Sequence, residues 1–489
     1  MHANFLAPLF LGTFPLVMLG LFLAYRPAVA VMVSLLAAEM FLPPLYALPI
    51  SPSWLTKWTL PPLVAGILVV IFGRSHLRRS HPLRGVEGIF LLSIVVAFMT
   101  FLTNRDPLHY GRVVLPGEDL KDLLGEVVQF FVIPWTAFFL GRILFKTSRD
   151  LKSLTRLLAI SVLIYSALIL IEIRTLPDLN QLVYGYQASR FDMTLRWGGY
   201  RPTVFFKDGL PLASFVLTCT LMILAMARVH MRLAHVSIKA ASFYVLVVLV
   251  ICKSTGVVLY ALLIVPLICL AAPRRILMVA SSFVLCFLIY PVLRFSDVIP
   301  VKSIADLFAG LSRARADSLL YRFNMEQLMM DLTKHRLWWG WGGWGRNLVY
   351  DSYSGRQISI PDGAVIITLS AHGMVGLFSY YFPFAYTVLR APKFIRRIKS
   401  RSDRLLLSAL TVNCAVILFD LIVNSAFPPI YMLIFGALCG LPAGILKEEA
   451  TQAIAVTRGD AGLAVEYEPA PDEAAHRKPR VGVRVPTGG

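Results

Sequence analysis

Arginines in the polar segments between apolar runs carry the first chemical signal. Arg201 lies in the segment from about 174 to 205, and Arg322 and Arg346 lie in the segment from about 296 to 363. A guanidinium group donates two parallel hydrogen bonds that match the oxygens of a phosphate. Arginines near a membrane also extend toward lipid headgroups without a specific ligand. We expect that a few of these arginines converge on an anionic group such as a pyrophosphate.

Two further segments could bring charged groups to the same ligand. Residues 196–209 read RWGGYRPTVFFKDG, and the paired glycines permit a close approach of the backbone. Lys207 and Asp208 stand at the end of this segment, directly before an apolar run. Lys253 occupies a polar break between two apolar runs, where a lysine also fits a simple interfacial position. All three are candidate substrate-binding residues.

A third segment combines tryptophan with glycine. Residues 338–347 read WWGWGGWGRN, and Asp362 follows after a polar stretch. Tryptophan is common at membrane interfaces, which explains such a cluster without a ligand. Aromatic faces also stack on pyranose rings, while glycines let the chain approach them. Both interpretations stay open, and the second makes Trp341 and Trp344 candidate sugar-binding residues.

The elements that must hold these residues are membrane-spanning helices. Of the 489 residues, 57% are hydrophobic and only 15% are charged, and a soluble globule could not bury so much apolar surface. The net charge is +19, and in a membrane protein such a positive excess usually comes from basic loops on one side of the membrane. We therefore expect no nucleic-acid partner. The six cysteines lie in apolar stretches without a CxxC pair and indicate neither a disulfide framework nor a metal site.

About 12–13 apolar segments are long enough to cross a bilayer, at roughly 20 residues per helix. We therefore expect an all-α, polytopic integral membrane protein. Its predicted parts are about ten helices in 1–295, a large periplasmic loop in 296–363, about three helices in 364–446 and a disordered cytoplasmic tail in 447–489. The candidate spans are 4–24, 27–50, 59–73, 87–103, 126–145, 157–174, 206–227, 240–252, 256–272, 276–296, 364–389, 405–422 and 429–446.

Charge asymmetry orients these helices. Short loops rich in Lys and Arg, such as 390–404, face the cytoplasm by the positive-inside rule. With an odd number of spans these loops all fall on one side, which leaves 174–205 and 296–363 on the outer side. Residues 312–336 carry apolar side chains at near-helical spacing and predict an amphipathic helix there. We expect the functional site on the outer face.

Several of these motifs, in this order, resemble the O-antigen ligase and polymerase superfamily. The turn at 339–346, the Asp362-Gly363 pair and residues 369–377 (LSAHGMVGL) resemble the family's outer loop and the span that follows it. Upstream, residues 201–205 (RPTVF) resemble the family's arginine segment, and residues 253–256 (KSTG) resemble its Ser-Arg-Gly segment. The resemblance covers about residues 196–390.

Three positions depart from the family's pattern. Asp362 stands where the family has histidine, and Gly363 stands where it has asparagine. Thr255 replaces the arginine of the Ser-Arg-Gly segment, so Lys253 is the nearest cation. Polymerases and exopolysaccharide proteins of the superfamily vary at these sites, so the departures bear more on the ligase interpretation than on membership of the superfamily.

The resemblance implies a GT-C-like glycosyltransferase, multi-pass in the bacterial inner membrane and active at its periplasmic face. Members transfer a glycan from an undecaprenyl-pyrophosphate carrier to an acceptor hydroxyl, with inversion and without a metal. No cofactor is implied. The implied partners are this donor, a glycan or lipid acceptor, membrane lipids and, in O-antigen, exopolysaccharide or capsule biosynthesis, chain-length regulators or export proteins.

Two chemical roles follow from this resemblance. The leaving pyrophosphate needs positive charge, which we assign to Arg201, Arg322 and Arg346. The attacking hydroxyl must lose a proton, and we assign Asp362 as the base. The competing candidate bases are Asp208, His335 and His372; a lone histidine inside a span, as His372 is, packs more often than it catalyses.

A transporter or flippase of polysaccharide or lipid-linked glycan is the alternative function, and a non-catalytic scaffold for a polysaccharide export complex is a third. Glu39, Glu172 and Asp420 lie in or near predicted spans, where carboxylates can relay protons. Pairing with a cation from a neighbouring span explains them equally well. The sequence has no inverted repeat of the kind that many transporters carry.

Overall fold

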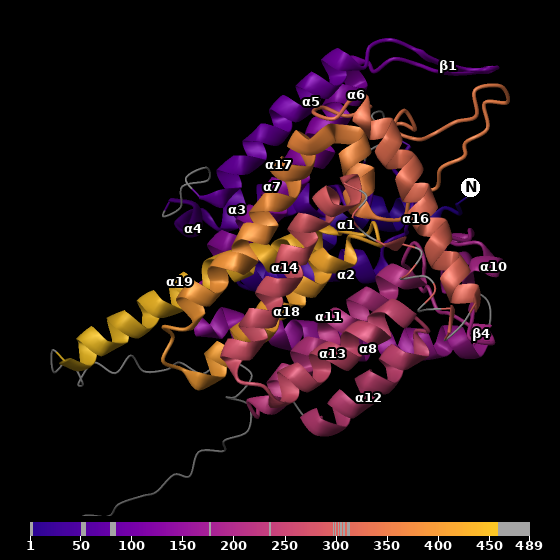
Figure 1. The fold of residues 1–489 in the computed structure, drawn as a ribbon. Helices are drawn as coiled ribbons and strands as arrows, with labels where there is room; N and C mark the ends of the chain where they lie inside the picture. The colour runs from indigo at the N-terminus through magenta and orange to yellow at the C-terminus, as the bar shows by residue number, and fades with distance from the viewer. Residues whose placement is uncertain are drawn as a thin grey trace, which may run out of the picture. The chain divides into compact units, whose positions relative to one another are not determined.

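The computed structural model is built almost entirely from helices (Figure 1). It describes residues 3–49, 55–78, 85–175, 178–233, 236–296 and 313–457, with a few single residues between 298 and 310. Residues Met1–Leu446 form one compact unit, and Lys447–Gly489 form a second.

The elements before residue 209 are α1 (Leu6–Ala24), α2 (Pro27–Phe41), α3 (Leu60–Phe72), α4 (Arg74–Arg78), η1 (Val86–Phe90), α5 (Leu91–Thr103), β1 (Leu108–Tyr110), β2 (Val113–Leu115), α6 (Leu120–Glu126), η2 (Val127–Val132), α7 (Ile133–Leu144), α8 (Ser148–Thr175), α9 (Leu179–Tyr184), α10 (Phe191–Thr194), β3 (Leu195–Arg196) and β4 (Gly199–Tyr200). The later elements are α11 (Gly209–Arg228), α12 (Ile238–Ile251), α13 (Thr255–Leu270), α14 (Pro273–Phe295), α16 (Arg313–Lys334), α17 (Ala364–Ile395), α18 (Arg401–Asp420) and α19 (Pro429–Thr457).

Nine helices in the described part of the chain are long and apolar enough to cross a membrane. Two of them are composite: η1 continues into α5, and α6 continues through η2 into α7. The other seven are α1, α8, α11, α14, α17, α18 and α19. The chain is therefore an all-α, multi-pass membrane protein. Four shorter apolar helices, α2, α3, α12 and α13, coincide with the remaining predicted spans, and their crossing stays a prediction.

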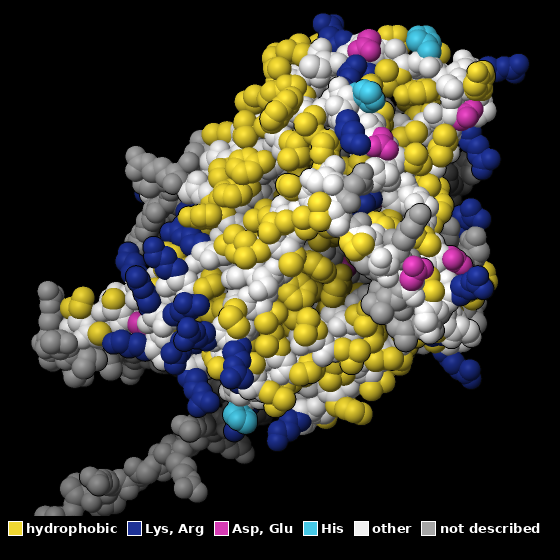
Figure 2. Space-filling model, in the orientation of Figure 1, with side chains coloured by type: hydrophobic (Ala, Val, Ile, Leu, Met, Phe, Trp, Pro, Cys, Tyr) yellow, Lys and Arg dark blue, Asp and Glu magenta, His cyan; other side chains and the backbone are white. Residues whose placement is uncertain are grey.

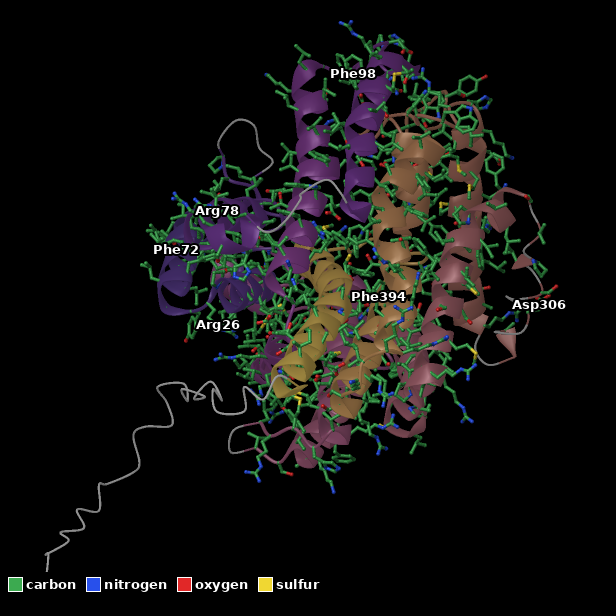
Figure 3. The ribbon with its side chains drawn as sticks, turned by 90° about the vertical axis from the view of Figure 1, so that its left-hand side faces the viewer. Arg26, Phe72, Arg78, Phe98, Asp306 and Phe394 are labelled. Carbon is green, nitrogen blue, oxygen red and sulfur yellow. The ribbon has the colours of Figure 1, made fainter. Side chains whose placement is uncertain are left out.

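The surface of the helices suits a lipid environment. Phe243 is 71% exposed, Leu16 is 69% exposed and Leu262 is 68% exposed, although all three lie within apolar helices. Figure 2 shows apolar side chains covering much of the helix faces, with Lys and Arg concentrated toward the ends of the helices. In Figure 3, Arg26, directly before α2, and Arg78, the last residue of α4, lie on the same flank of the molecule. A bilayer accounts for exposed apolar area of this extent.

The helices that carry the candidate residues pack side by side. α11 packs against α8, α12, α13 and α18, and α18 also packs against α14 and α17. α16 lies against α17. The predicted helix in 312–336 is present as α16, and its amphipathic character stays a prediction. The packing of α16 on α17 brings together the two parts of the chain that flank the tryptophan and glycine turn.

α17 is broken at Gly373, whose φ of 67° and ψ of −170° are not helical. The tryptophan and glycine turn, which we define as residues 338–345, enters this break. The backbone N–H groups of Trp341 and Gly342 donate to the carbonyls of Ser370 and Ala371, each at 2.9 Å. The turn thus satisfies carbonyls that a broken helix would leave without partners, which is what a membrane interior requires.

The C-terminal helix α19 extends farther than the sequence predicts. A disordered tail is predicted from residue 447, but α19 continues to Thr457 because no glycine or proline lies between Leu446 and that residue. The rest of the tail, 458–489, lies outside the described residues, as does most of 297–312 in the large loop.

Candidate functional site

Arg201 is the centre of a group of charged side chains that we call the basic cluster: Arg196, Arg201, Lys253, Arg322, Asp208, Asp362 and Asp420. Arg201 is only 7% exposed, and its Nε and Nη2 atoms have no hydrogen-bond partner among the described residues. Burial lowers the pKa of Arg201, Asp208 opposes this shift, and the charges of Arg196 and Arg322 reinforce it. A buried guanidinium with unpaired donors is costly, so an anion bound here would relieve a desolvation penalty.

A buried carboxylate fixes the loop that carries Arg201. Glu172, near the end of α8, accepts hydrogen bonds from Thr203 N at 2.7 Å, Val204 N at 2.8 Å and Tyr200 Oη at 3.0 Å. The β3–β4 hairpin ends directly before Arg201. Glu172, which the sequence left as a candidate proton carrier, is therefore engaged in holding the loop in place.

Two glycines, which lack a Cβ atom, leave the space that two cations of the cluster occupy. A Cβ atom on Gly199, in β4, would overlap Nζ of Lys253, and a Cβ atom on Gly209 would overlap Nε of Arg201. Gly209 is the first residue of α11, which Asp208 caps by accepting a hydrogen bond from Leu210 N at 2.7 Å. The predicted close approach at the paired glycines is thus confirmed for Gly199, where the approaching group is a lysine.

The other side of the basic cluster comes from α16 and from Asp362, two residues before the start of α17. Nε of Arg322 lies 3.1 Å from Oδ2 of Asp362. The charge of Arg322 also acts on Asp420, at the end of α18, whose carboxylate accepts a hydrogen bond from Ser214 at 2.9 Å. Helix α16 is anchored one turn farther on, where Glu326 accepts from Tyr290 Oη at 2.7 Å and lies 3.4 Å from Arg294.

Arg346 does not lie in this cluster. It is 1% exposed, donates from Nη1 to the carbonyl of Pro116 at 2.8 Å, and interacts with Asp106 and Glu118 rather than with Arg201. The expectation that three arginines converge therefore holds for Arg201 and Arg322 alone. Arg346 directly follows the tryptophan and glycine turn, which packs into the break in α17. This packing places Arg346 beside the segment after α5 instead.

The remaining predicted ligand residues have different surroundings. Trp341 donates from Nε1 to Leu332 O at 2.9 Å, and the guanidinium of Arg336 lies 4.3 Å from its ring centroid, so both its edge and a face are occupied. Trp344 is 69% exposed and lines a cavity. Lys207 is exposed.

The cavity beside Trp344, which we call the aromatic cavity, has a volume of about 500 Å³. Its walls come from the α6–η2–α7 span, the first half of α17 and the segment before and after Phe427. Nε2 of His372 lies 3.3 Å from Oε2 of Glu126, and both residues line the cavity. The ring of His372 packs 4.1 Å from that of Phe130, and its Nδ1 has no partner among the described residues.

Sequence reasoning missed this pair as a unit. Glu126 stands where α6 gives way to the π-helix η2, and His372 precedes the break in α17. Both irregularities depend on tertiary contacts, and π-helical turns frequently occur at functional sites. The Ala-His-Gly sequence before an apolar run was the one available signal.

Two carboxylates meet the glycines of the tryptophan and glycine turn. Glu118 accepts from Gly343 N at 3.2 Å, and Cβ atoms on Gly342 and Gly343 would meet Glu118 and Glu126 respectively. Burial, and next the charge of Glu126, raise the pKa of Glu118 to about 7. The turn therefore needs glycine here in order to admit acidic side chains next to the aromatic cavity.

Glu39 has a structural explanation. Its carboxylate lies 3.6 Å from Nζ of Lys57 and accepts from Trp58 Nε1 at 2.7 Å, and both members of the ion pair are almost fully buried.

Among the described residues, no three His, Cys, Asp or Glu side chains form a group that could hold a metal ion. No family model and no curated protein matches the chain. The superfamily resemblance therefore rests on the motifs alone.

Proposed function

We propose that the protein is a membrane glycosyltransferase. It polymerises or ligates oligosaccharide repeat units carried on undecaprenyl pyrophosphate, in the inner membrane and at the periplasmic face, as an inverting enzyme that needs no metal. The observation that carries this proposal is the buried Arg201, with two unpaired donor atoms, on which the charges of Arg196 and Arg322 act. Lys253 lies against Gly199, in the hairpin that ends directly before Arg201. Guanidinium groups with free donors at the ends of membrane helices suit the phosphate oxygens of a lipid-linked pyrophosphate.

The proposed chemistry divides between the two ends of the basic cluster. The acceptor hydroxyl attacks the anomeric carbon, the bond from that carbon to the pyrophosphate oxygen breaks, and the hydroxyl proton passes to Asp362. Arg201, Lys253 and Arg322 stabilise the charge that develops on the leaving pyrophosphate. Arg322 is the residue that links both events, because its guanidinium pairs with Asp362 before substrate binds.

The test is transfer by purified protein in nanodiscs with a lipid-pyrophosphate-linked oligosaccharide from the native host, with and without EDTA. Product length is followed by gel and mass spectrometry. Longer carrier-linked product in EDTA supports a polymerase, and transfer only to an added acceptor supports a ligase. Arg201→Gln and Arg322→Gln should abolish transfer, whereas Arg356→Gln, at an exposed arginine outside the cluster, should not. Normal transfer by both cluster variants would end the proposal that these arginines stabilise the pyrophosphate.

Transport of a lipid-linked glycan is the second candidate, and the Glu126–His372 pair favours it. A titratable pair beside a broken helix and a cavity is a common arrangement in proton-coupled transporters. Proteoliposomes with lipid-linked oligosaccharide on one leaflet distinguish the two functions. Movement of the oligosaccharide between leaflets, without any change in its length or acceptor, would replace the glycosyltransferase proposal.

A further inference from the structure

A second cavity lies at the other ends of the helices that hold the basic cluster. Residues of the cluster stand at the start of α11, α13 and α17 and at the end of α18. The opposite ends of these four helices, with the start of α14, enclose a cavity of about 780 Å³ that we call the arginine cavity. It is therefore distinct from the site proposed for glycosyl transfer, and a ligand bound there does not depend on that reaction.

The lining of the arginine cavity is strongly basic. No Asp or Glu is among the described residues that line it. Its cationic residues, besides His230, are Arg228, Arg274, Arg396, Arg401 and Arg404. Like charges around one cavity repel each other unless an anion lies between them.

The arginines differ in how far the protein already satisfies them. Arg228 donates from Nη1 to the carbonyls of Ile268 and Ala271 at 2.5 and 2.7 Å, so it closes the end of α13. Arg404, in the first turn of α18, has a buried Nε without a partner among the described residues. A guanidinium donor held out of water in this way lacks a ligand that accepts hydrogen bonds.

The rim of the cavity indicates a lipid rather than a dissolved anion. Leu270 lines the cavity and is 81% exposed, and Met278, which follows the lining residue Leu277 in the sequence, is 62% exposed. Figure 2 shows Lys and Arg side chains next to apolar ones at the lower ends of the helices in that view. An acyl chain can follow these apolar side chains while a phosphate occupies the basic interior.

We propose that the arginine cavity binds the headgroup phosphate of an anionic phospholipid, with the acyl chains along Leu270. Basic pockets between the ends of transmembrane helices bind such headgroups by charge and by paired hydrogen bonds to the phosphate oxygens. Arg274 and Arg404, from the two helices α14 and α18 that pack against each other, contact the phosphate.

The test uses full-length protein in nanodiscs that contain phosphatidylglycerol and phosphatidylcholine, followed by native mass spectrometry of the released protein. We expect retained phosphatidylglycerol on the wild type and a several-fold loss of it in the Arg274→Gln/Arg404→Gln double variant. Arg397→Gln is the matched control, because Arg397 is exposed nearby but does not line the cavity. Arg404→Lys keeps the positive charge and should retain part of the binding. This variant distinguishes a loss of lipid binding from a loss of the fold.

Two results would overturn this proposal. Equal phosphatidylglycerol retention by the wild type and by a folded double variant would show that the cavity does not hold the lipid. The second result is a comparison of thermal stability in detergent. If inorganic phosphate stabilises the protein at least as much as phosphatidylglycerol does, a soluble anion is the ligand instead.

Discussion

Nε of Arg322 lies 3.1 Å from Oδ2 of Asp362, which joins the arginine assigned to phosphate to the carboxylate assigned to the proton. The side chains are 37% and 47% exposed, so solvent screens their attraction. Exposed ion pairs of this kind contribute about 0–1 kcal/mol to stability. An incoming pyrophosphate can therefore take the arginine from the carboxylate at little cost, which frees Asp362 to accept a proton.

The first prediction separates catalysis from stability at this pair. Asp362→Asn should reduce transfer by roughly 100-fold or more, because the amide cannot accept the hydroxyl proton. The same variant should change the free energy of unfolding by less than about 1 kcal/mol, because the pair is exposed. Transfer assays and thermal unfolding in detergent measure the two effects, with Asp351→Asn as a control outside the basic cluster. Undiminished transfer by Asp362→Asn would remove this residue as the base.

The second prediction concerns the glycines that admit the cations. Gly199→Ala and Gly209→Ala should each weaken binding of a lipid pyrophosphate, because the added Cβ displaces Lys253 or Arg201. Gly256→Ala is the control, since no atom outside its own helical turn lies within 4 Å of a Cβ there. Microscale thermophoresis with undecaprenyl pyrophosphate compares the three variants. Equal affinity in all three would mean that the cations do not contact this ligand.

The third prediction is a pH dependence of stability at Glu118. Burial raises the pKa of this carboxyl to about 7 in the folded protein, from about 4.5 for a glutamate in an unfolded chain. The folded state is therefore favoured below pH 4.5, and this contribution is lost as pH rises toward 7. Glu118→Gln keeps an acceptor for Gly343 N and should be more stable than the wild type by about 1–3 kcal/mol near pH 8.

The control for this effect is Asp331→Asn, at an exposed carboxylate on α16. Thermal unfolding followed by fluorescence across the pH range gives the stability of each variant. The difference between Glu118→Gln and the wild type should vanish near pH 4. A difference that is constant from pH 4 to 8 would contradict the assignment.

Nine of the predicted spans are confirmed as helices of sufficient length because a long apolar run alone indicates them. The proximity of Arg201 and Arg322 could be expected because their segments flank such runs. The position of Arg346 could not be predicted, since it depends on how the turn at 338–345 docks into the break of α17. Glu172 and Glu39 similarly gained structural partners from distant segments, Thr203 and Lys57, which no local pattern indicates.

The Glu126–His372 pair could not be predicted from the sequence, for the same physical reason. Its members are far apart in the sequence and meet only because α17 packs against the composite spans that contain α5 and η2. The π-helix at 127–132 looks like ordinary apolar span sequence, and Gly373 is read as a helix residue unless its backbone angles are known. The tertiary fold, rather than local propensity, creates this site.

The last prediction tests whether that pair acts as a unit in the proposed reaction. Glu126→Gln and His372→Gln each remove one partner of a 3.3 Å contact inside the aromatic cavity. The candidate sugar-binding residue Trp344 also lines this cavity, so if the cavity holds the acceptor glycan during transfer, each variant should lower transfer strongly. Because the two groups contact each other, the double variant should be no worse than either single variant, so their effects are not additive. His109→Gln, at an exposed histidine on β1, should leave transfer unchanged. Binding of undecaprenyl pyrophosphate should be retained in all of them, since the basic cluster is intact. Strictly additive losses would mean that the two residues act separately, and wild-type transfer by both single variants would leave the cavity without a role in the reaction.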